Sequence, residues 1–343
     1  MKITSIGNGI EVSDIDLEDD EACRELGRLV AHECVVLLRQ AVLEKRLYEI
    51  QMLWGQPGLP IINRYILERR LTGAHWREVF LAMGAMTSKL DSPSGFPGMA
   101  RVSVDRDKRG RYTGAFPIGE LDWHWDQQGY HDHQRVVGLM SLWGSAGSQT
   151  AFLCTAPGYE ALNHEDRSMV DELVTVWAWD DGKVRADMVP VQRQVIRYSG
   201  IPHDVMETRL LETTASGRKG VRFPSHCFSH FKGMTREESR KVKDHLWEQF
   251  AAPENVYTHD WQDGQIVFMD QNITLRARPT HVGHDDTRTM TRMISYMDRL
   301  FPGNGPADHV LYNGEQLSHD RFAALASEAR LAEHTRQELA PAS

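Results

Sequence analysis

The sequence predicts a mainly β domain, of the jelly-roll or sandwich class, with helices flanking the strands. Short runs of β-type composition recur between residues 101 and 296 and are separated by turn residues, a spacing typical of sandwiches and jelly rolls. The chain is also 343 residues long and 41% hydrophobic, so it can bury a sizeable core. The expected strands are Arg101–Val104, Val136–Trp143, Ala151–Cys154, Val174–Trp179, Val189–Tyr198, Gly220–Phe223, Gln265–Asp270 and Thr289–Tyr296.

Helical patterns precede and interrupt these strands. Near the amino end, residues 21–33 and 43–55 have helical periodicity, and the apolar run 34–38 between them is typical of a strand. Two more helices are expected, at Asn163–Leu173 and at Thr235–Ala251. The second of these opens with a capping box, because Thr235 is followed three residues later by Glu238.

The predicted domain organisation is one domain at residues 1–301 and a helical tail at 302–343, whose helical stretch is His319–Leu339. The segment Met83–Met99 is rich in Gly, Pro, Ser and Met, a composition typical of a loop. We expect a lid insertion over a pocket at about residues 66–100; an ordinary surface loop is the alternative.

Composition excludes several classes of partner. The net charge is −9 and the basic residues are scattered, whereas nucleic-acid binding needs a clustered positive face. The amino terminus has no signal pattern and the apolar runs are too short to span a bilayer, so we expect a cytoplasmic protein without membrane contact. The four cysteines form no CxxC pair, which predicts buried free thiols and no disulfide framework.

The densest group of chemistry-bearing residues is the segment from Gly119 to Asp126, which reads GELDWHWD. On an extended strand, residues i and i+2 point to the same face, so His124 and Asp126 can present an imidazole and a carboxylate to one metal ion. This pair makes two thirds of a 2-His-1-carboxylate triad for Fe(II). An isolated HxD pattern arises easily by chance, so its context decides its meaning.

Four segments, in order along the chain, resemble the taurine dioxygenase-like family of Fe(II)/2-oxoglutarate oxygenases. Residues 31–39, AHECVVLLR, are similar to the first core strand of that family, and GELDWHWD is similar to its first metal-binding strand. Residues 147–152, GSQTAF, resemble its glycine-turn-threonine element, and residues 261–271, WQDGQIVFMDQ, resemble its W-x-x-G-D-x-x-x-x-D-N strand. The resemblance spans about residues 30–297 and implies a double-stranded β-helix, that is, a cupin-like jelly roll.

The resemblance also implies a ligand set and an activity. His124 and Asp126 would hold Fe(II), while Thr150 and Arg288 would bind the distal carboxylate of 2-oxoglutarate. Arg288 and Arg292 reproduce the R-x-x-x-R pattern of the family, and a guanidinium can grip a carboxylate through two parallel hydrogen bonds. Arg292 is also a candidate anchor for an acidic group of the substrate. The implied reaction uses O2 to hydroxylate or desaturate a small polar molecule, such as an amino acid or a carboxylic acid. Separately, the helical stretch His319–Leu339 can pack on the domain or mediate association into a homo-oligomer.

Arg276 departs from the family pattern, in which a histidine stands six positions after the aspartate that corresponds to Asp270. A guanidinium stays protonated and offers no lone pair to a metal. Three explanations stay open. His281 or His284 can supply the missing nitrogen. Alternatively, the metal can bind through His124, Asp126 and a chelating 2-oxoglutarate, with solvent in the vacant position. In the third, Arg276 pairs with Asp126 and replaces the charge of the metal with its own.

Two functions from different classes therefore follow from the sequence. The first is an Fe(II)/2-oxoglutarate-dependent oxygenase, with activity impaired or absent because of Arg276. The second is a non-catalytic protein that binds 2-oxoglutarate or another small molecule on the same scaffold.

Overall fold

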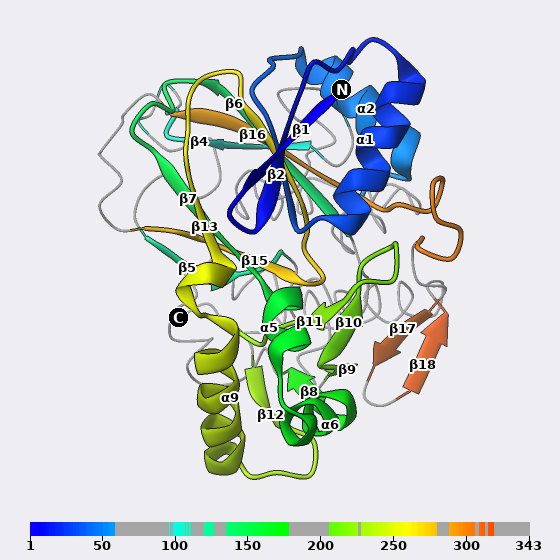
Figure 1. The fold of residues 1–343 in the computed structure, drawn as a ribbon, viewed down its shortest axis with the longest axis vertical. Coiled ribbons are helices and arrows are strands. Elements are labelled where there is room, and N and C mark those ends of the chain that lie inside the picture. Colours follow the sequence, from blue (N-terminus) through cyan, green and yellow to red (C-terminus); the bar gives the residue numbers. More distant parts are fainter. Residues whose placement is uncertain are drawn as a thin grey trace, which may run out of the picture.

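The computed structural model describes residues 1–58, 96, 99–106, 108, 110, 120–126, 135–177, 206–225, 228–279, 288–305, 309–312 and 315–318. Within these ranges the chain is mainly β with flanking helices, and two sheets form its centre (Figure 1). This confirms the predicted class. No described helix is both long enough and apolar enough to cross a bilayer.

The larger sheet has seven described strands, which pair antiparallel except for the parallel pair β2 and β3. In sheet order they are β1 (Lys2–Ile6), β2 (Gly9–Ser13), β3 (Val35–Leu38), β14 (Ile266–Asp270), β6 (Val136–Trp143), β16 (Thr289–Ser295) and β4 (Met99–Ser103). The second sheet has four described antiparallel strands: β13 (Val256–Asp260), β7 (Gln149–Cys154), β15 (Thr274–Arg278) and β5 (Leu121–His124).

The central strands of the larger sheet are apolar on both faces because both faces are covered. In β14, Ile266 and Phe268 belong to one hydrophobic cluster, while Val267 and Met269 belong to another. Alternation with a period of two sends these pairs to opposite sides of the sheet. The sheet is therefore the middle layer of the domain, with helices on one side and the four-stranded sheet on the other.

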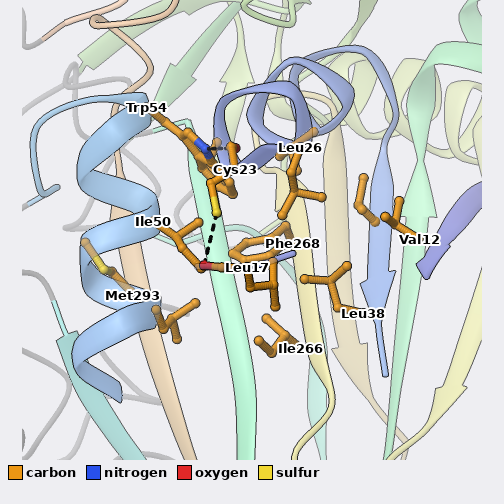
Figure 2. Packing of buried hydrophobic residues seen from close by; sticks show 14 of the residues in the cluster. Val12, Leu17, Cys23, Leu26, Leu38, Ile50, Trp54, Ile266, Phe268 and Met293 are labelled. Carbon is orange, nitrogen blue, oxygen red and sulfur yellow. Dashed lines mark hydrogen bonds between the residues drawn. The ribbon is translucent and has the colours of Figure 1, made fainter. Parts of the chain in front are cut away.

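Two helices cover the outer face of the seven-stranded sheet: α1 (Asp20–His32) and α2 (Glu44–Trp54). Figure 2 shows Ile50 and Trp54 of α2 pointing toward Phe268, where the indole ring of Trp54 meets the Phe268 ring edge-on at 4.9 Å. The indole nitrogen of Trp54 also donates to the backbone oxygen of Cys23 in α1, at 2.8 Å. The expected order of helix, strand and helix near the amino end is thus confirmed.

The inner face of the sheet packs against β7 and β15, and two cysteines meet there. Cys34, just before β3, and Cys154, at the end of β7, are joined by a disulfide with their Cα atoms 5.7 Å apart. The prediction of free thiols is therefore wrong for this pair. Its members are 120 residues apart in the sequence, and only the facing of the two sheets brings them together. Cys23 is free and buried, and Cys227 lies outside the described residues.

A second group of helices packs on the outer face of the four-stranded sheet, in the lower half of Figure 1. The expected helices at 163–173 and 235–251 are confirmed, and the capping box of Thr235 and Glu238 is present. The helices are α5 (Thr155–Ala161), α6 (His164–Glu172) and α9 (Arg236–Phe250), followed by a 3-10 turn at Pro253–Asn255. The small strands beside them are β8 (Val174–Trp177), β9 (Met206–Arg209), β10 (Leu211–Thr213), β11 (Lys219–Val221) and β12 (Phe228–Phe231).

Parts of the predicted organisation lie outside the described residues. These parts are the expected strand at 189–198, most of the lid at about 66–100 and the helical stretch at 319–339. The tail nevertheless begins with a hairpin that the sequence did not predict, formed by β17 (His309–Tyr312) and β18 (Glu315–Ser318). The amino-terminal hairpin of β1 and β2 was also missed. Its strands are short, and β1 is largely exposed, so it lacks the apolar pattern of a core strand.

Asp270, the fully buried last residue of β14, gives the fold a predictable pH dependence. Burial raises the pKa of its carboxyl group to about 6, although Arg135 and Arg222 act in the opposite direction. A carboxyl whose pKa is raised by folding stabilises the folded state most at low pH. As the pH rises from about 4 to about 6, we expect the free energy of unfolding to fall by up to about 3 kcal/mol from this group.

Replacing Asp270 by asparagine should remove that fall. Urea unfolding between pH 4 and 7 measures it, and Asp244→Asn on the exposed face of α9 is the matched control. If the Asp270→Asn variant keeps the full pH dependence of the natural protein, Asp270 does not titrate in this range.

Candidate active site

The candidate site is a small pocket between the two sheets, with a volume of about 50 Å³. Strands β4, β6 and β16 line it from the larger sheet, and β5, β7 and β15 line it from the smaller sheet. Leu139 and Met290 contribute apolar surface. The polar side chains that line it are His124, Thr150, Arg276, Arg278, Arg288 and Arg292. The pocket thus brings together five of the six predicted site residues, and the sixth, Asp126, contacts two of them.

Strand β5 presents His124 to the pocket. The Nδ1 atom of His124 donates to the backbone oxygen of Asp122, at 2.6 Å, because a carbonyl oxygen can only accept. In the neutral ring, Nε2 is then the atom with the lone pair. A backbone carbonyl on the other ring nitrogen is the usual way in which a protein orients a metal-binding histidine. The orientation of His124 therefore suits its predicted role.

Asp126 lies two residues beyond the end of β5 and is only 8% exposed. Its backbone N–H donates to the side-chain oxygen of Gln271, at 3.0 Å, in the turn between β14 and β15. The side chain of Gln271, in the turn between β14 and β15, therefore holds the Asp126 backbone in place. The sequence suggested a continuous strand through His124 and Asp126, whereas β5 ends at His124.

Two arginines occupy both carboxylate oxygens of Asp126. Arg276 donates from Nη2 to Oδ1 at 2.5 Å, and Arg292 donates from Nη1 to Oδ2 at 2.8 Å. Burial of the Asp126 carboxyl group acts to raise its pKa, but the charges of Arg276 and Arg292 outweigh this effect and hold the pKa well below its usual range. Asp126 is therefore ionised at neutral pH and is neutralised by side chains of the protein. The pairing of Arg276 with Asp126, one of the three explanations left open by the sequence, is present in the structure, and Arg292 joins it.

The position of Arg276 follows from strand pairing. Arg276 lies directly opposite His124 in the register of β15 and β5. The next paired residues are Arg278 and Leu121. The partner on β5 therefore moves by three residues while β15 moves by two. This irregularity turns both Leu121 and His124 toward the pocket, although residues three apart on a regular strand face opposite sides.

Thr150 faces the pocket from β7 as a hydrogen-bond donor. The indole nitrogen of Trp261 donates to its hydroxyl oxygen at 2.9 Å. With its oxygen accepting from the indole, the hydroxyl can direct its own proton to an acceptor in the pocket. A carboxylate oxygen is such an acceptor, which agrees with the role expected for Thr150.

Arg278 is a pocket residue that the sequence analysis missed. It lies on β15, on the same face as Arg276, and is only 6% exposed. The signal was present in the segment Thr274-Leu275-Arg276-Ala277-Arg278, where polar and apolar residues alternate with a period of two. Two arginines on the inner face of a buried strand are costly unless they have a partner or a function, so this pattern could have drawn attention to both.

The described residues do not fit the Fe(II) that the resemblance implies. A facial triad needs three protein ligands, and in the part of the chain that the structure describes no three His, Cys, Asp or Glu side chains are placed to hold a metal. Arg276, which the resemblance places at the third corner, has no lone pair to offer and repels a cation. The alternative ligands His281 and His284 lie outside the described residues.

Comparison with known proteins finds relatives both by sequence and by structure. The chain is 25% identical to pentalenolactone F synthase of Streptomyces arenae over 201 residues, and 22% identical to an alkylsulfatase of Acinetobacter baylyi over 214 residues. These matches cover 55% and 61% of this chain and 66% and 65% of the relatives, slightly less than two thirds of their own length. The crystal structure of a taurine dioxygenase from Burkholderia xenovorans has the same fold, with a TM-score of 0.60 and 18% identity over 95% of this chain and 98% of that one. Because the sequence also matches the family description over residues 3–294, the chain belongs to the taurine catabolism dioxygenase TauD, TfdA family.

Proposed function

We propose that this protein binds 2-oxoglutarate, or a dicarboxylate of the same size, in the pocket between the sheets without Fe(II). Membership of the family indicates a scaffold of the Fe(II)- and 2-oxoglutarate-dependent dioxygenases. The observation that carries the proposal is the double ion pair of Asp126 with Arg276 and Arg292. It gives the carboxylate two cationic partners where the family places a metal.

The donors of the pocket support the binding of a dicarboxylate. Thr150 and Arg288 line the pocket and are the residues expected to hold the distal carboxylate. The Nη1 atom of Arg276 is buried and has no hydrogen-bond partner among the described residues. A buried donor without a partner is unfavourable, so an acceptor oxygen of a bound ligand would stabilise it. The second carboxylate of the ligand suits this position.

Isothermal titration of the natural protein with 2-oxoglutarate, in the presence of a metal chelator, tests the proposal. We expect saturable binding, and a loss of affinity of about 10- to 100-fold in Arg288→Gln, because a hydrogen bond to a charged group contributes about 1.5–3 kcal/mol. Arg240→Gln on the exposed face of α9 is the matched control and should bind as the natural protein does. Binding that appears only when Fe(II) is added would contradict the proposal.

The second candidate is the activity of the family, the oxidation of a small polar molecule such as an amino acid or a carboxylic acid with 2-oxoglutarate and O2. The orientation of His124 favours it, since the Nδ1 contact with the Asp122 carbonyl suits a metal ligand. This function requires Arg276 to leave Asp126, or His281 or His284 to reach the site. Anaerobic addition of Fe(II) and 2-oxoglutarate separates the two candidates. A visible charge-transfer band followed by succinate release on admitting O2 supports the oxidation, and the absence of both supports binding alone.

A further inference from the structure

Arg222 is a buried cation that contacts two segments next to Asp126. It directly follows β11 and is 2% exposed. Its guanidinium group lies over the indole ring of Trp125, 4.7 Å from the ring centroid, and its Nη2 atom donates to the side-chain oxygen of Asn272. Trp125 immediately precedes Asp126, while Asn272 lies in the turn between β14 and β15. The described residues that line the pocket do not include Arg222, so its contacts act from outside the pocket.

The segment that carries Arg222 holds the indole ring of Trp125 in two ways. The guanidinium group covers the face of the ring, and the indole nitrogen donates to the backbone oxygen of the next residue, Phe223, at 3.3 Å. The ring also meets that of Trp177 edge-on, with the centroids 5.5 Å apart. A cation over an indole face is an attractive contact, and more so when it is shielded from water. These contacts fix the residue just before Asp126.

The other contact of Arg222 lies beside the hydrogen bond that holds Asp126. Asn272 is the neighbour of Gln271, whose side-chain oxygen accepts from the Asp126 N–H at 3.0 Å. The backbone N–H of Asn272 also donates to the Asp270 carboxylate at 2.9 Å, within the same turn. One guanidinium group therefore bridges the residue before Asp126 and the turn that accepts from the Asp126 backbone.

The contacts of Arg222 require the geometry of an arginine. A planar guanidinium stacks on an aromatic ring through its face and donates hydrogen bonds from its edge, whereas the ammonium group of lysine is a compact point charge. The Nη1 atom of Arg222 also lies 3.6 Å from the carboxylate of Glu212. A buried charge is tolerated when it has partners of this kind. A lysine at position 222 could make one of these contacts well, but not all of them at once.

We propose that Arg222 is a positioning residue, which fixes the backbone of Asp126 and, through it, the two ion pairs of the Asp126 carboxylate. The direction of that carboxylate decides which donor atoms of Arg276 and Arg292 it engages and which of them face the pocket. Loss of the bridge should therefore loosen the hydrogen bond between Asp126 and Gln271 before it disturbs the centre of the sheets. This role does not require a ligand, and only its effect on affinity rests on the proposed function.

Hydrogen exchange of the Asp126 amide, followed by NMR in the ligand-free protein, tests this role. In Arg222→Met the Asp126 amide should exchange about 10-fold faster relative to the amide of Val267 in the middle of β14, as the loss of one hydrogen bond implies. The ratio of the two rates corrects for a general loss of stability, because global unfolding exposes both amides. Arg222→Lys, which keeps a positive charge beside Glu212, should give a smaller increase of this ratio.

Three further variants separate positioning from packing. Arg218→Met removes the cation at the other end of β11, where Arg218 pairs with Glu160 at 3.2 Å, and should leave the ratio unchanged. Gln271→Met removes the acceptor itself and should raise the ratio as Arg222→Met does. The double variant of Gln271→Met and Arg222→Met should add little to either single change, because both act on one hydrogen bond.

A folded Arg222→Met variant that keeps the natural ratio overturns the positioning role. If that variant does not fold, an unchanged ratio in Arg222→Lys overturns it in the same way. Fully additive effects of Arg222→Met and Gln271→Met also overturn it, because they would show that the two residues act on different contacts.

Titration with 2-oxoglutarate measures how far the role of Arg222 reaches into the pocket. Arg222→Lys should bind about 3- to 10-fold more weakly than the natural protein, and Arg218→Met should bind equally well. Unchanged affinity in Arg222→Lys overturns the effect on the pocket. Failure of the natural protein to bind 2-oxoglutarate overturns the proposed function instead, while the exchange rates, measured without ligand, still decide the role of Arg222.

Discussion

The variant Arg276→His is expected to bind Fe(II) at least about 100-fold more tightly than the natural protein. The substitution removes a fixed positive charge beside Asp126 and places an imidazole opposite His124 in the register of β5 and β15. Three protein ligands then surround the site, as a facial triad requires. Replacing the repulsive charge with a third ligand should improve the binding free energy of Fe(II) by on the order of 3 kcal/mol or more. Each difference of about 1.4 kcal/mol corresponds to a tenfold change in affinity. Anaerobic titration with Fe(II) and 2-oxoglutarate, followed by the visible charge-transfer band, measures the change.

Two controls make this result specific. Arg276→Gln removes the charge without supplying an imidazole, so it should gain much less affinity than Arg276→His. The same titration of His281→Ala, made in the natural background, tests the other source of a ligand. If the natural protein binds iron as tightly as Arg276→His and His281→Ala abolishes that binding, the third corner belongs to His281 and not to residue 276.

The second large effect is on stability. Asp126→Asn is expected to lower the free energy of unfolding by about 3–5 kcal/mol, the usual cost of removing one partner from a buried ion pair. The asparagine would leave Arg276 and Arg292, which are both at least 91% buried as side chains, facing a neutral amide and each other. Urea unfolding at pH 7 measures the loss. Glu21→Gln is the control, because Glu21 pairs with Arg24 and Arg28 on the exposed face of α1 and exposed pairs contribute at most about 1 kcal/mol.

The pH dependence of the same variant gives an independent check. Folding lowers the pKa of Asp126 below its ordinary value of 3.8. A carboxyl of this kind stabilises the fold above its unfolded pKa, and the stabilisation is lost as the pH falls through lower values. The difference between the natural protein and Asp126→Asn should therefore be constant near pH 7 and shrink below about pH 4. A difference that does not depend on pH would contradict the ionised pair.

The ion pairs of Asp126 explain how a site of this family can stay folded without a metal. A lone buried carboxylate is costly, and a metal ion is one way to neutralise it. Here two guanidinium groups supply the charge and one hydrogen bond to each carboxylate oxygen. Because the compensation comes from the chain itself, the stability of this site should not depend on iron. Chelation of metals should therefore leave the melting temperature unchanged.

Much of the fold could be predicted because it depends on local patterns. The apolar runs at residues 136–143 and 266–270 are buried on both faces and became β6 and β14. The capping box at Thr235 marked the start of α9. By contrast, β15 was missed, because its arginines interrupt the apolar pattern although the strand is almost entirely buried. A strand that lines a polar pocket cannot be recognised by hydrophobicity alone.

The sequence by itself determined the family resemblance, the mainly β class and five of the polar residues that line the pocket, because each of these resides in short segments. It also marked Arg276 as the departure, through its spacing from Asp270 and from Arg288. Only the tertiary structure decided which side chains meet. Arg276 and Arg292 reach Asp126 across 150 and 166 residues of chain, and the irregular pairing of β15 with β5 brings His124 opposite Arg276. Such contacts depend on how two sheets face each other, and this arrangement is a property of the whole packed core that no single segment encodes.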